Sequence, residues 1–413
     1  MKNVTDSWKT LISCRAVGKS LPTLTLALLW CASASGVGLR DPNQDPEGIA
    51  RGNAFVATAD NPSAIYYNPA GITQLQGNNA RVDLYLISAN TDYRANGVQA
   101  HTDDSVQPVP SLYYVYAPTN LPLAFGLGVY TPFGLSLDWG KKTPFTSLAE
   151  DGQILYVCIN PVVAWRVNDK LSLAIGPDIN YSTATLNRGI YGVPGGQFHF
   201  SGNGTGFGFN AGARWQPIDQ LAFGVNYHSA SQMTYKGSSG TRPTPPLPGP
   251  SDTQATAQFP QFIVGGISYR PTENWNLEAD IDWTDWDTLN TVLFRGTSVG
   301  NVPFVFNYKS SFMYEFGVTR QLGKGYFLST GYIYSENSSP NKNFNPIVPD
   351  SILHLGSVGL GHHGQRWDWT VAYHFAYGDR DVTGNVQVGT AETANGHYHT
   401  FNNAIDLAAT FKF

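Results

Sequence analysis

The sequence has few charged residues, few cysteines and only one long apolar run. Charged residues make up 13% of the chain, whereas ordinary soluble domains carry about 25%. Of the three cysteines, Cys14 and Cys31 precede residue 35, which leaves Cys158 alone. A single cysteine excludes an internal disulfide and therefore a disulfide-stapled scaffold. No stretch after residue 34 reaches the roughly 20 apolar residues that a membrane-spanning helix needs.

The N-terminus has the features of a secretory signal peptide. Four basic residues precede the apolar run Leu21–Trp30, and a small-residue site ends at Ala34. This order predicts a signal peptide over residues 1–34. Its removal leaves 21 Lys and Arg against 29 Asp and Glu, a formal charge of −8. Such an acidic balance is unsuited to nucleic acid, so no nucleic-acid partner is expected.

Aromatic residues and glycine are abundant, and several segments alternate apolar and polar residues. The last segment carries an apolar set on one face, namely Ile405, Leu407, Phe411 and Phe413. Asp406 and Lys412 fall on the opposite face, as period-two strands require. This pattern fits a transmembrane barrel strand and also the edge of a soluble sandwich. Trp and Tyr near the strand ends favour the barrel, whose interfaces carry aromatic girdles.

Short and long connections alternate along the chain. Six short turns are expected near residues 118–121, 167–170, 217–219, 271–274, 322–325 and 363–365. Seven longer loops are expected near residues 95–106, 138–151, 187–203, 237–252, 296–307, 337–350 and 380–397. Thirteen connections predict an all-β, 14-stranded antiparallel barrel over residues 80–413. Short turns on one side and long loops on the other are typical of the bacterial outer membrane.

Residues 35–79 do not fit the strand pattern. Two Asn-Pro steps, at Asn61 and Asn68, interrupt regular structure there. The segment is either a periplasmic extension or a plug in the lumen. A 14-stranded barrel is too wide for its own side chains to fill, which favours the plug.

Six segments of the chain occur in the same order as the motifs of a known family. They lie at residues 52–60, 66–72, 125–134, 282–286, 345–350 and 356–361, and the most specific motif among them is Asn68-Pro69-Ala70. In these segments the chain resembles the FadL/TodX-type outer-membrane transporters of long-chain fatty acids and aromatic hydrocarbons. The resemblance covers nearly the whole mature chain.

The resemblance implies a monomer in contact with outer-membrane lipid, plugged by an N-terminal hatch. It further implies that a hydrophobic small molecule binds in an apolar lumen pocket, that the hatch rearranges, and that the ligand leaves sideways into the bilayer. The hatch motif falls on Asn68, Pro69 and Ala70. The kinked third strand of the family falls on the segment that contains Gly126, Gly128, Pro132, Phe133 and Gly134.

Strand chemistry supports the kink independently. Pro132 cannot donate to a sheet ladder, and the neighbouring glycines supply no side chain. Because a closed barrel has no edges, such a proline predicts a break in the ladder. A kink without a passage would explain the same residues.

The substrate and two other function classes stay open. A fatty acid carboxylate requires a lumen cation, for which Arg188 and Lys309 are candidates; hydrocarbons require none. A general diffusion porin would share the strand pattern but have no N-terminal plug. A barrel-embedded acyl hydrolase would need a serine beside His374, and the sequence indicates none. No cofactor, metal site or catalytic residue is predicted, so the protein is not expected to be an enzyme.

Overall fold

The structure, a computed structural model, describes residues 39–413. The predicted signal peptide therefore lies outside the described residues. The described chain consists of a short helical segment followed by one closed antiparallel sheet. None of the described helices is long and apolar enough to cross a membrane.

The sheet is a barrel because its last strand pairs with its first. β20 (Gly396–Lys412) joins β1 (Gly77–Ala95) over a long register that includes Ala80 and Phe411. The predicted all-β, 14-stranded antiparallel barrel is confirmed. Five of the strands are interrupted and so carry two labels each. In order round the wall after β1, the strands are β3 (Val106–Ala117), β4 (Leu123–Tyr130) with β5 (Gly134–Asp138), β6 (Asp151–Arg166), β7 (Leu171–Gly189), β8 (Gln197–Ile218), β9 (Leu221–His228) with β10 (Ser231–Arg242), β12 (Phe262–Thr272) with β11 (Ser251–Phe259), β13 (Trp275–Thr284) with β14 (Thr291–Thr297), β16 (Ser311–Gly323) with β15 (Gly300–Val305), β17 (Tyr326–Ser335), β18 (Leu353–His363), β19 (Trp367–Val382) and β20.

The alternation in sequence separates an apolar outer face from an inner face that meets the hatch or lines the lumen. Ile405 and Phe411 are exposed on the outer face, whereas Asp406 is only 1% exposed on the inner face. The ammonium of Lys412 lies 2.7 Å from a carboxylate oxygen of Asp368, also on the inner face. The terminal strand therefore has the expected sidedness.

The strands extend further toward the long-loop end than the sequence indicates. Loops were expected over residues 187–203 and 237–252, but β7 continues to Gly189, β8 starts at Gln197 and β10 continues to Arg242. In this extension the outward residues are polar, so the apolar alternation that marks a membrane strand disappears while the ladder continues. A small additional strand, β2 (Val98–His101), pairs with the end of β1.

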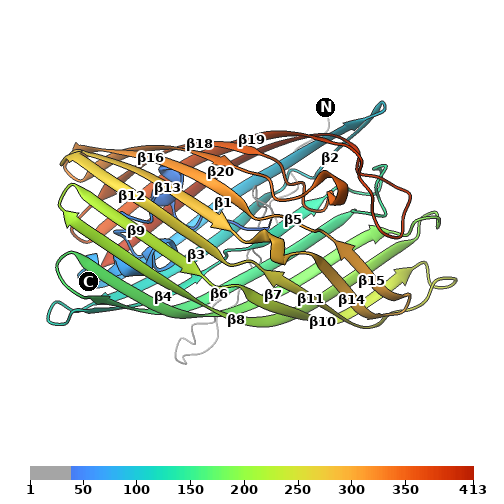
Figure 1. The fold of residues 1–413 in the computed structure, drawn as a ribbon, viewed down its shortest axis with the longest axis horizontal. Helices are drawn as coiled ribbons and strands as arrows, with labels where there is room; N and C mark the ends of the chain where they lie inside the picture. Colours follow the sequence, from blue (N-terminus) through green and yellow to red (C-terminus); the bar gives the residue numbers. More distant parts are fainter. Residues whose placement is uncertain (1–38) are drawn as a thin grey trace, which may run out of the picture. The chain divides into compact units, whose positions relative to one another are not determined.

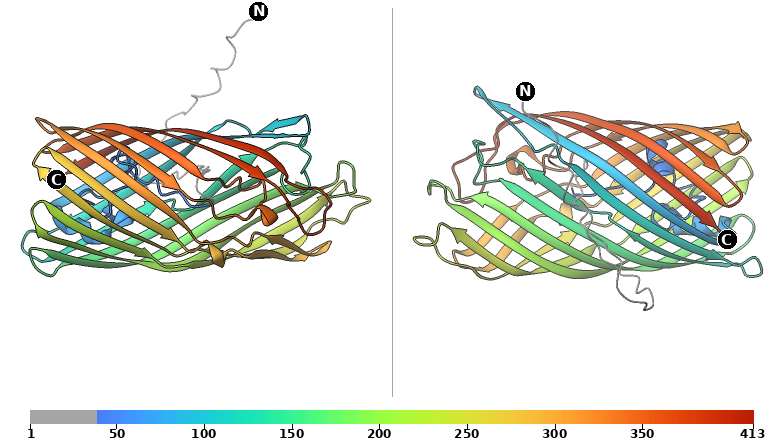
Figure 2. Two further views of the ribbon diagram at one scale, coloured as in Figure 1. Left: turned by 45° about the horizontal axis from the view of Figure 1, so that its top comes forward. Right: turned by 180° about the vertical axis from the view of Figure 1, so that it is seen from behind.

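The N-terminal segment lies inside the barrel near the end with the short turns, where the C-terminus also lies (Figures 1 and 2). It contains α1 (Pro46–Ala50), α2 (Ala64–Tyr67) and the 3-10 helix η1 (Pro69–Gln74). Helix α1 begins with Pro46 at its first position, and the Asp45 side chain accepts the amide of Glu47. We call residues 39–76 the hatch; β1 starts directly after it, at Gly77.

Two further 3-10 turns lie in the connections. η2 (Trp286–Thr288) stands between β13 and β14, and η3 (Asn341–Asn343) lies in the long loop between β17 and β18. The latter loop includes residues 345–350, one of the segments that resemble the transporter family.

Candidate functional site

Asn68 joins the hatch to the wall at the centre of its motif. Its amide nitrogen donates to the carbonyls of Val56 (2.7 Å) and Ala213 (3.0 Å), and its side-chain oxygen accepts the amide of Ala70. Pro69 follows as the first residue of η1. One fully buried side chain thus caps a helix, holds the hatch loop and contacts β8. A side-chain amide supplies the two N–H donors and the acceptor oxygen that these three bonds require.

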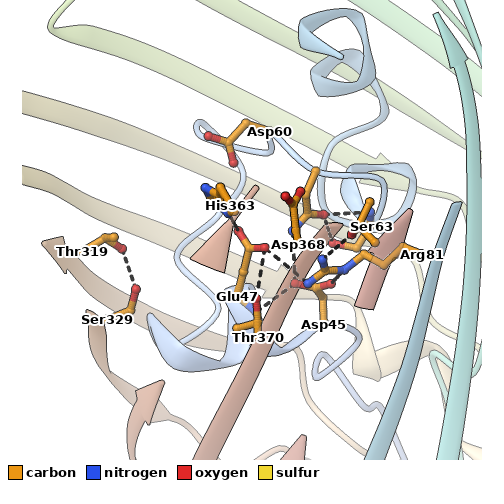
Figure 3. A network of polar contacts seen from close by, with 12 residues as sticks. Asp45, Glu47, Asp60, Ser63, Arg81, Thr319, Ser329, His363, Asp368 and Thr370 are labelled. Atoms are coloured by element: carbon orange, nitrogen blue, oxygen red, sulfur yellow. Dashed lines mark hydrogen bonds and ion pairs between the residues drawn. The ribbon is translucent and has the colours of Figure 1, made fainter. Parts of the chain in front are cut away.

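A polar network fixes α1 to the opposite wall (Figure 3). The guanidinium of Arg81 is ion-paired with Asp45 and lies 3.4 Å from Glu47. The other carboxylate oxygen of Glu47 lies 3.3 Å from Nε2 of His363. Burial alone would raise the pKa of Glu47, but His363 and Arg81 outweigh it and hold the pKa well below its usual range. Glu47 is therefore an ionised, fully paired anchor.

Inward-facing glycines let the hatch backbone contact the wall directly. A Cβ atom at Gly224 would lie 2.1 Å from the Val56 carbonyl oxygen, and one at Gly331 would lie 1.9 Å from the Gly52 amide. At Gly212 it would lie 2.3 Å from the side-chain oxygen of Asn68. Backbone atoms cannot move aside as the tips of side chains can. The wall therefore needs glycine at these positions to leave room for the hatch.

The third barrel strand is broken between β4 and β5. Six consecutive residues, 130–135, are buried, whereas β4 shows alternating exposure. The break is centred on Pro132, inside the segment 126–134 to which the resemblance assigns the kink. Gly126 and Gly128 do not belong to it, because both are regularly paired with β3 and β6. A Cβ atom at either would instead lie within 3 Å of the hatch residue Ile65.

The first described residues form an arm that pairs with the kink from inside. The Gly134 amide donates to the Leu39 carbonyl (2.9 Å), and the Asp41 amide donates to the Pro132 carbonyl (2.9 Å). Arg40 then extends across the lumen to Asp282, with 2.6 Å between nitrogen and oxygen. The arm, residues 39–41, thus acts as a short extra strand on the inner side of the break.

Asp41 makes the docked arm sensitive to protonation. Burial raises its pKa to about 7, although the Asn43 amide donates to one of its oxygens. Its other carboxylate oxygen has no hydrogen-bond partner. A raised folded-state pKa means that the docked arm favours the protonated acid. By linkage we therefore expect docking of the arm to weaken as the pH rises from the usual aspartate pKa to about 7.

Beside the kink the wall lacks strand pairing. The register between β3 and β4 ends at Leu112 and Val129, and β5 pairs with β6 on its other side. In the described part of the chain no strand pairing links β5 to residues 106–111 of β3. A single backbone bond, from the Asp103 amide to the Asp138 carbonyl (2.8 Å), closes the far end of this gap.

An apolar cavity adjoins the arm in the half of the barrel nearer the long loops. It contains about 790 Å³ of atom-free space, part of which is open to solvent. Leu39 of the arm and Leu135 of β5 line it near the kink, and Ile347 and Val348 line it from the loop between β17 and β18. Its aromatic lining consists of Phe200, Tyr235, Phe259, Trp286, Phe294, Phe304 and Phe306. Few polar side chains interrupt this surface, which therefore suits a hydrophobic ligand.

Of the two predicted cationic candidates, only Arg188 lies beside the cavity. Its guanidinium carbon lies 4.7 Å from the ring centre of Phe304, which lines the cavity. Its Nη1 donates to the Ser147 carbonyl (3.4 Å), Nε has no hydrogen-bond partner, and no carboxylate within residues 39–413 forms an ion pair with this side chain. Lys309 is exposed between β15 and β16 and does not line the cavity.

The sequence matches the family of outer membrane protein transport proteins (OMPP1/FadL/TodX) over residues 25–413. The chain belongs to this family. It is an outer-membrane β-barrel that transports hydrophobic compounds, and not an enzyme.

Similar FadL/TodX members show how far the likeness extends. The long-chain fatty acid transport protein of Salmonella typhi is 23% identical, covering 73% of this chain and 78% of its own. A putative outer membrane protein of Neisseria meningitidis is 22% identical, covering 92% of this chain and 96% of its own. The crystal structure of a Pseudomonas aeruginosa FadL homologue has a TM-score of 0.81 at 18% identity, covering 91% and 100%. The crystal structure of the Pseudomonas putida toluene transporter TodX has a TM-score of 0.71 at 15% identity, covering 93% of this chain and 100% of its own.

The structure corrects one expectation about His374. The sequence indicated no serine beside it, yet the register pairs Ser357 directly with His374 across β18 and β19. Ser357 Oγ makes no hydrogen bond, and Nε2 of His374 lies 3.0 Å from the Tyr85 hydroxyl instead. The pairing of β18 with β19 brings the two residues together, and residue spacing along the chain does not reveal this pairing. They form no hydrogen-bonded nucleophile and base, in keeping with a FadL/TodX transporter.

Proposed function

We propose that this protein takes up hydrophobic molecules that carry a carboxylate, such as long-chain fatty acids, and releases them sideways into the outer membrane. The observation that carries the proposal is the position of the apolar cavity. Two of its lining residues, Leu39 of the arm and Leu135 of β5, belong to the segments beside the unpaired stretch of wall.

Transfer energetics favour a lateral exit. Each buried methylene contributes about 0.8 kcal/mol, so a hydrophobic chain resists leaving an apolar site for water. The half of the lumen at the short-turn end holds the hatch and its polar contacts with the wall. A gap that opens toward lipid keeps the ligand in an apolar phase. Uptake then proceeds downhill by binding, arm undocking and diffusion through the wall.

The relatives' names include both substrate classes, so the choice between them rests on this chain's own residues. The Salmonella typhi relative is named a fatty acid transporter, whereas TodX is named a toluene transporter. Arg188 favours the first class here. Its Nε is an unpaired donor next to Phe304 of the cavity lining, and an aromatic hydrocarbon would leave that donor unused.

Replacing Arg188 should separate the two substrate classes. We expect Arg188→Gln to weaken oleate binding and uptake by roughly 10- to 100-fold, because a hydrogen bond to a charged group contributes about 1.5–3 kcal/mol. Toluene uptake should stay at the parent level. Both are measured in cells that lack other transporters of this family.

Lys309→Gln is the matched control, since it removes an exposed cation from the same chain. Equal oleate uptake by the parent and Arg188→Gln would remove the argument for a carboxylate ligand.

A further inference from the structure

Strand β13 presents a row of buried carboxylates to the hatch. Glu278, Asp280 and Asp282 occupy alternate inward positions and are each less than 5% exposed. Sequence alternation predicts their inward direction, where they would line a wet lumen or pair with Arg or Lys near the strand ends. In the structure each of them contacts the hatch or its arm.

Two of these carboxylates accept four consecutive backbone amides of the hatch. One oxygen of Asp280 accepts the amides of Phe55 (2.8 Å) and Val56 (2.9 Å). One oxygen of Glu278 accepts the amides of Ala57 (2.7 Å) and Thr58 (3.1 Å). The second oxygen of Glu278 accepts the Thr58 hydroxyl. Residues 55–58 therefore depend on β13 for their amide partners.

Buried amides need partners, and these four have none within the hatch. Moving residues 55–58 away from β13 breaks all four bonds together unless water or new partners replace them. The Arg51 guanidinium, 3.8 Å from Glu278, supplies the nearest positive charge on the hatch side. On the wall side, a Cβ at Gly266, which pairs with Asp280 in the register, would lie 2.7 Å from the Val56 side chain.

We propose that Glu278 and Asp280 are positioning residues that hold the hatch closed. This inference rests on the proposed function in treating the hatch as the barrier across the lumen. The two carboxylates recognise backbone amides, so they fix residues 55–58 in place whatever their side chains. The hatch can move as a unit only when the hydrogen bonds from residues 55–58 to these two carboxylates break. The arm is held by separate hydrogen bonds, at the kink.

A neighbouring residue separates this role from a general effect of lumen charge. Glu315 on β16 is the cross-strand partner of Asp280 and is equally buried. Within residues 39–413 it makes no side-chain hydrogen bond to the hatch. It is therefore a carboxylate at the same depth without the contact in question.

The test compares the Glu278→Ala/Asp280→Ala double variant with Glu315→Ala in planar bilayers. We expect the double variant to raise the frequency of ion-conducting openings roughly tenfold or more, since it leaves four buried backbone amides without their acceptors. Glu315→Ala should resemble the parent. Asp280→Asn, which retains an oxygen acceptor, should open less often than Asp280→Ala. Slower gel migration after boiling verifies that each variant has formed its barrel.

The inference fails if the double variant forms its barrel and stays closed, or if Glu315→Ala opens as often. Thr58→Val adds a variant that leaves every barrel strand unchanged, and it should give an intermediate opening frequency. Parent-level closure with Thr58→Val would count against the contact to Glu278. Ion conductance reports on the hatch alone, whereas oleate uptake reports on the proposed function, so the two failures remain distinguishable.

Discussion

Deleting the hatch, residues 39–76, should convert the protein from a closed barrel into a steadily conducting pore. The wall closes between β1 and β20 without any hatch residue, so the barrel should still form. A 14-stranded barrel without a plug encloses an aqueous lumen. Arg81, Glu278 and Asp280 would then face water, which lowers the cost of their lost partners. Single-channel recording in planar bilayers measures the effect.

The same recording distinguishes the transporter from a general diffusion porin. A porin would conduct before the deletion and change little after it. Parent protein that conducts as the deletion variant does would show that residues 39–76 do not block the lumen. Slower migration of the boiled deletion variant in gels is the control for a formed barrel.

Locking the arm to the kink should abolish uptake reversibly. Arg40 and Phe133 form an antiparallel bridge flanked by hydrogen bonds from both neighbours. Such a non-hydrogen-bonded pair has Cα atoms about 4.5 Å apart, within the range of a disulfide. We expect Arg40→Cys/Phe133→Cys to lose most oleate uptake when oxidised and to regain it with a reductant.

Each single cysteine variant controls for the loss of the Arg40–Asp282 ion pair and of the Phe133 ring. Cys158 is buried and should be replaced by alanine in all variants to prevent mispairing. Uptake that is equal in the oxidised and reduced double variant would mean that the ligand does not pass the arm.

The barrel and the place of the hatch follow from local sequence patterns. Period-two alternation in residues 405–413 and the alternation of turn lengths predict the closed sheet, because a membrane wall imposes one apolar face on every strand. The prediction weakens where that constraint ends. Beyond the apolar band, polar strands such as the start of β8 resemble loops.

The contacts of the candidate site were harder to predict from the sequence, because they join residues that lie far apart in the chain. Arg40 and Asp282 are 242 positions apart, and their ion pair depends on how the arm enters the lumen. Glu278 and Asp280 accept hydrogen bonds from backbone amides of the hatch. Because the backbone amide does not depend on the side chain, no sequence pattern marks these partners. Gly126 suggested a kink by composition, whereas its actual constraint is the packing of Ile65.

Photolabelling tests the lateral route most directly. A long-chain fatty acid with a diazirine at its tail would be bound to the protein in outer-membrane vesicles, irradiated, and its adducts located by mass spectrometry. The account predicts adducts on residues lining the cavity and on both sides of the gap, at residues 106–111 of β3 and 134–138 of β5. Adducts confined to the cavity and the short-turn end of the lumen, with none at the gap, would contradict it.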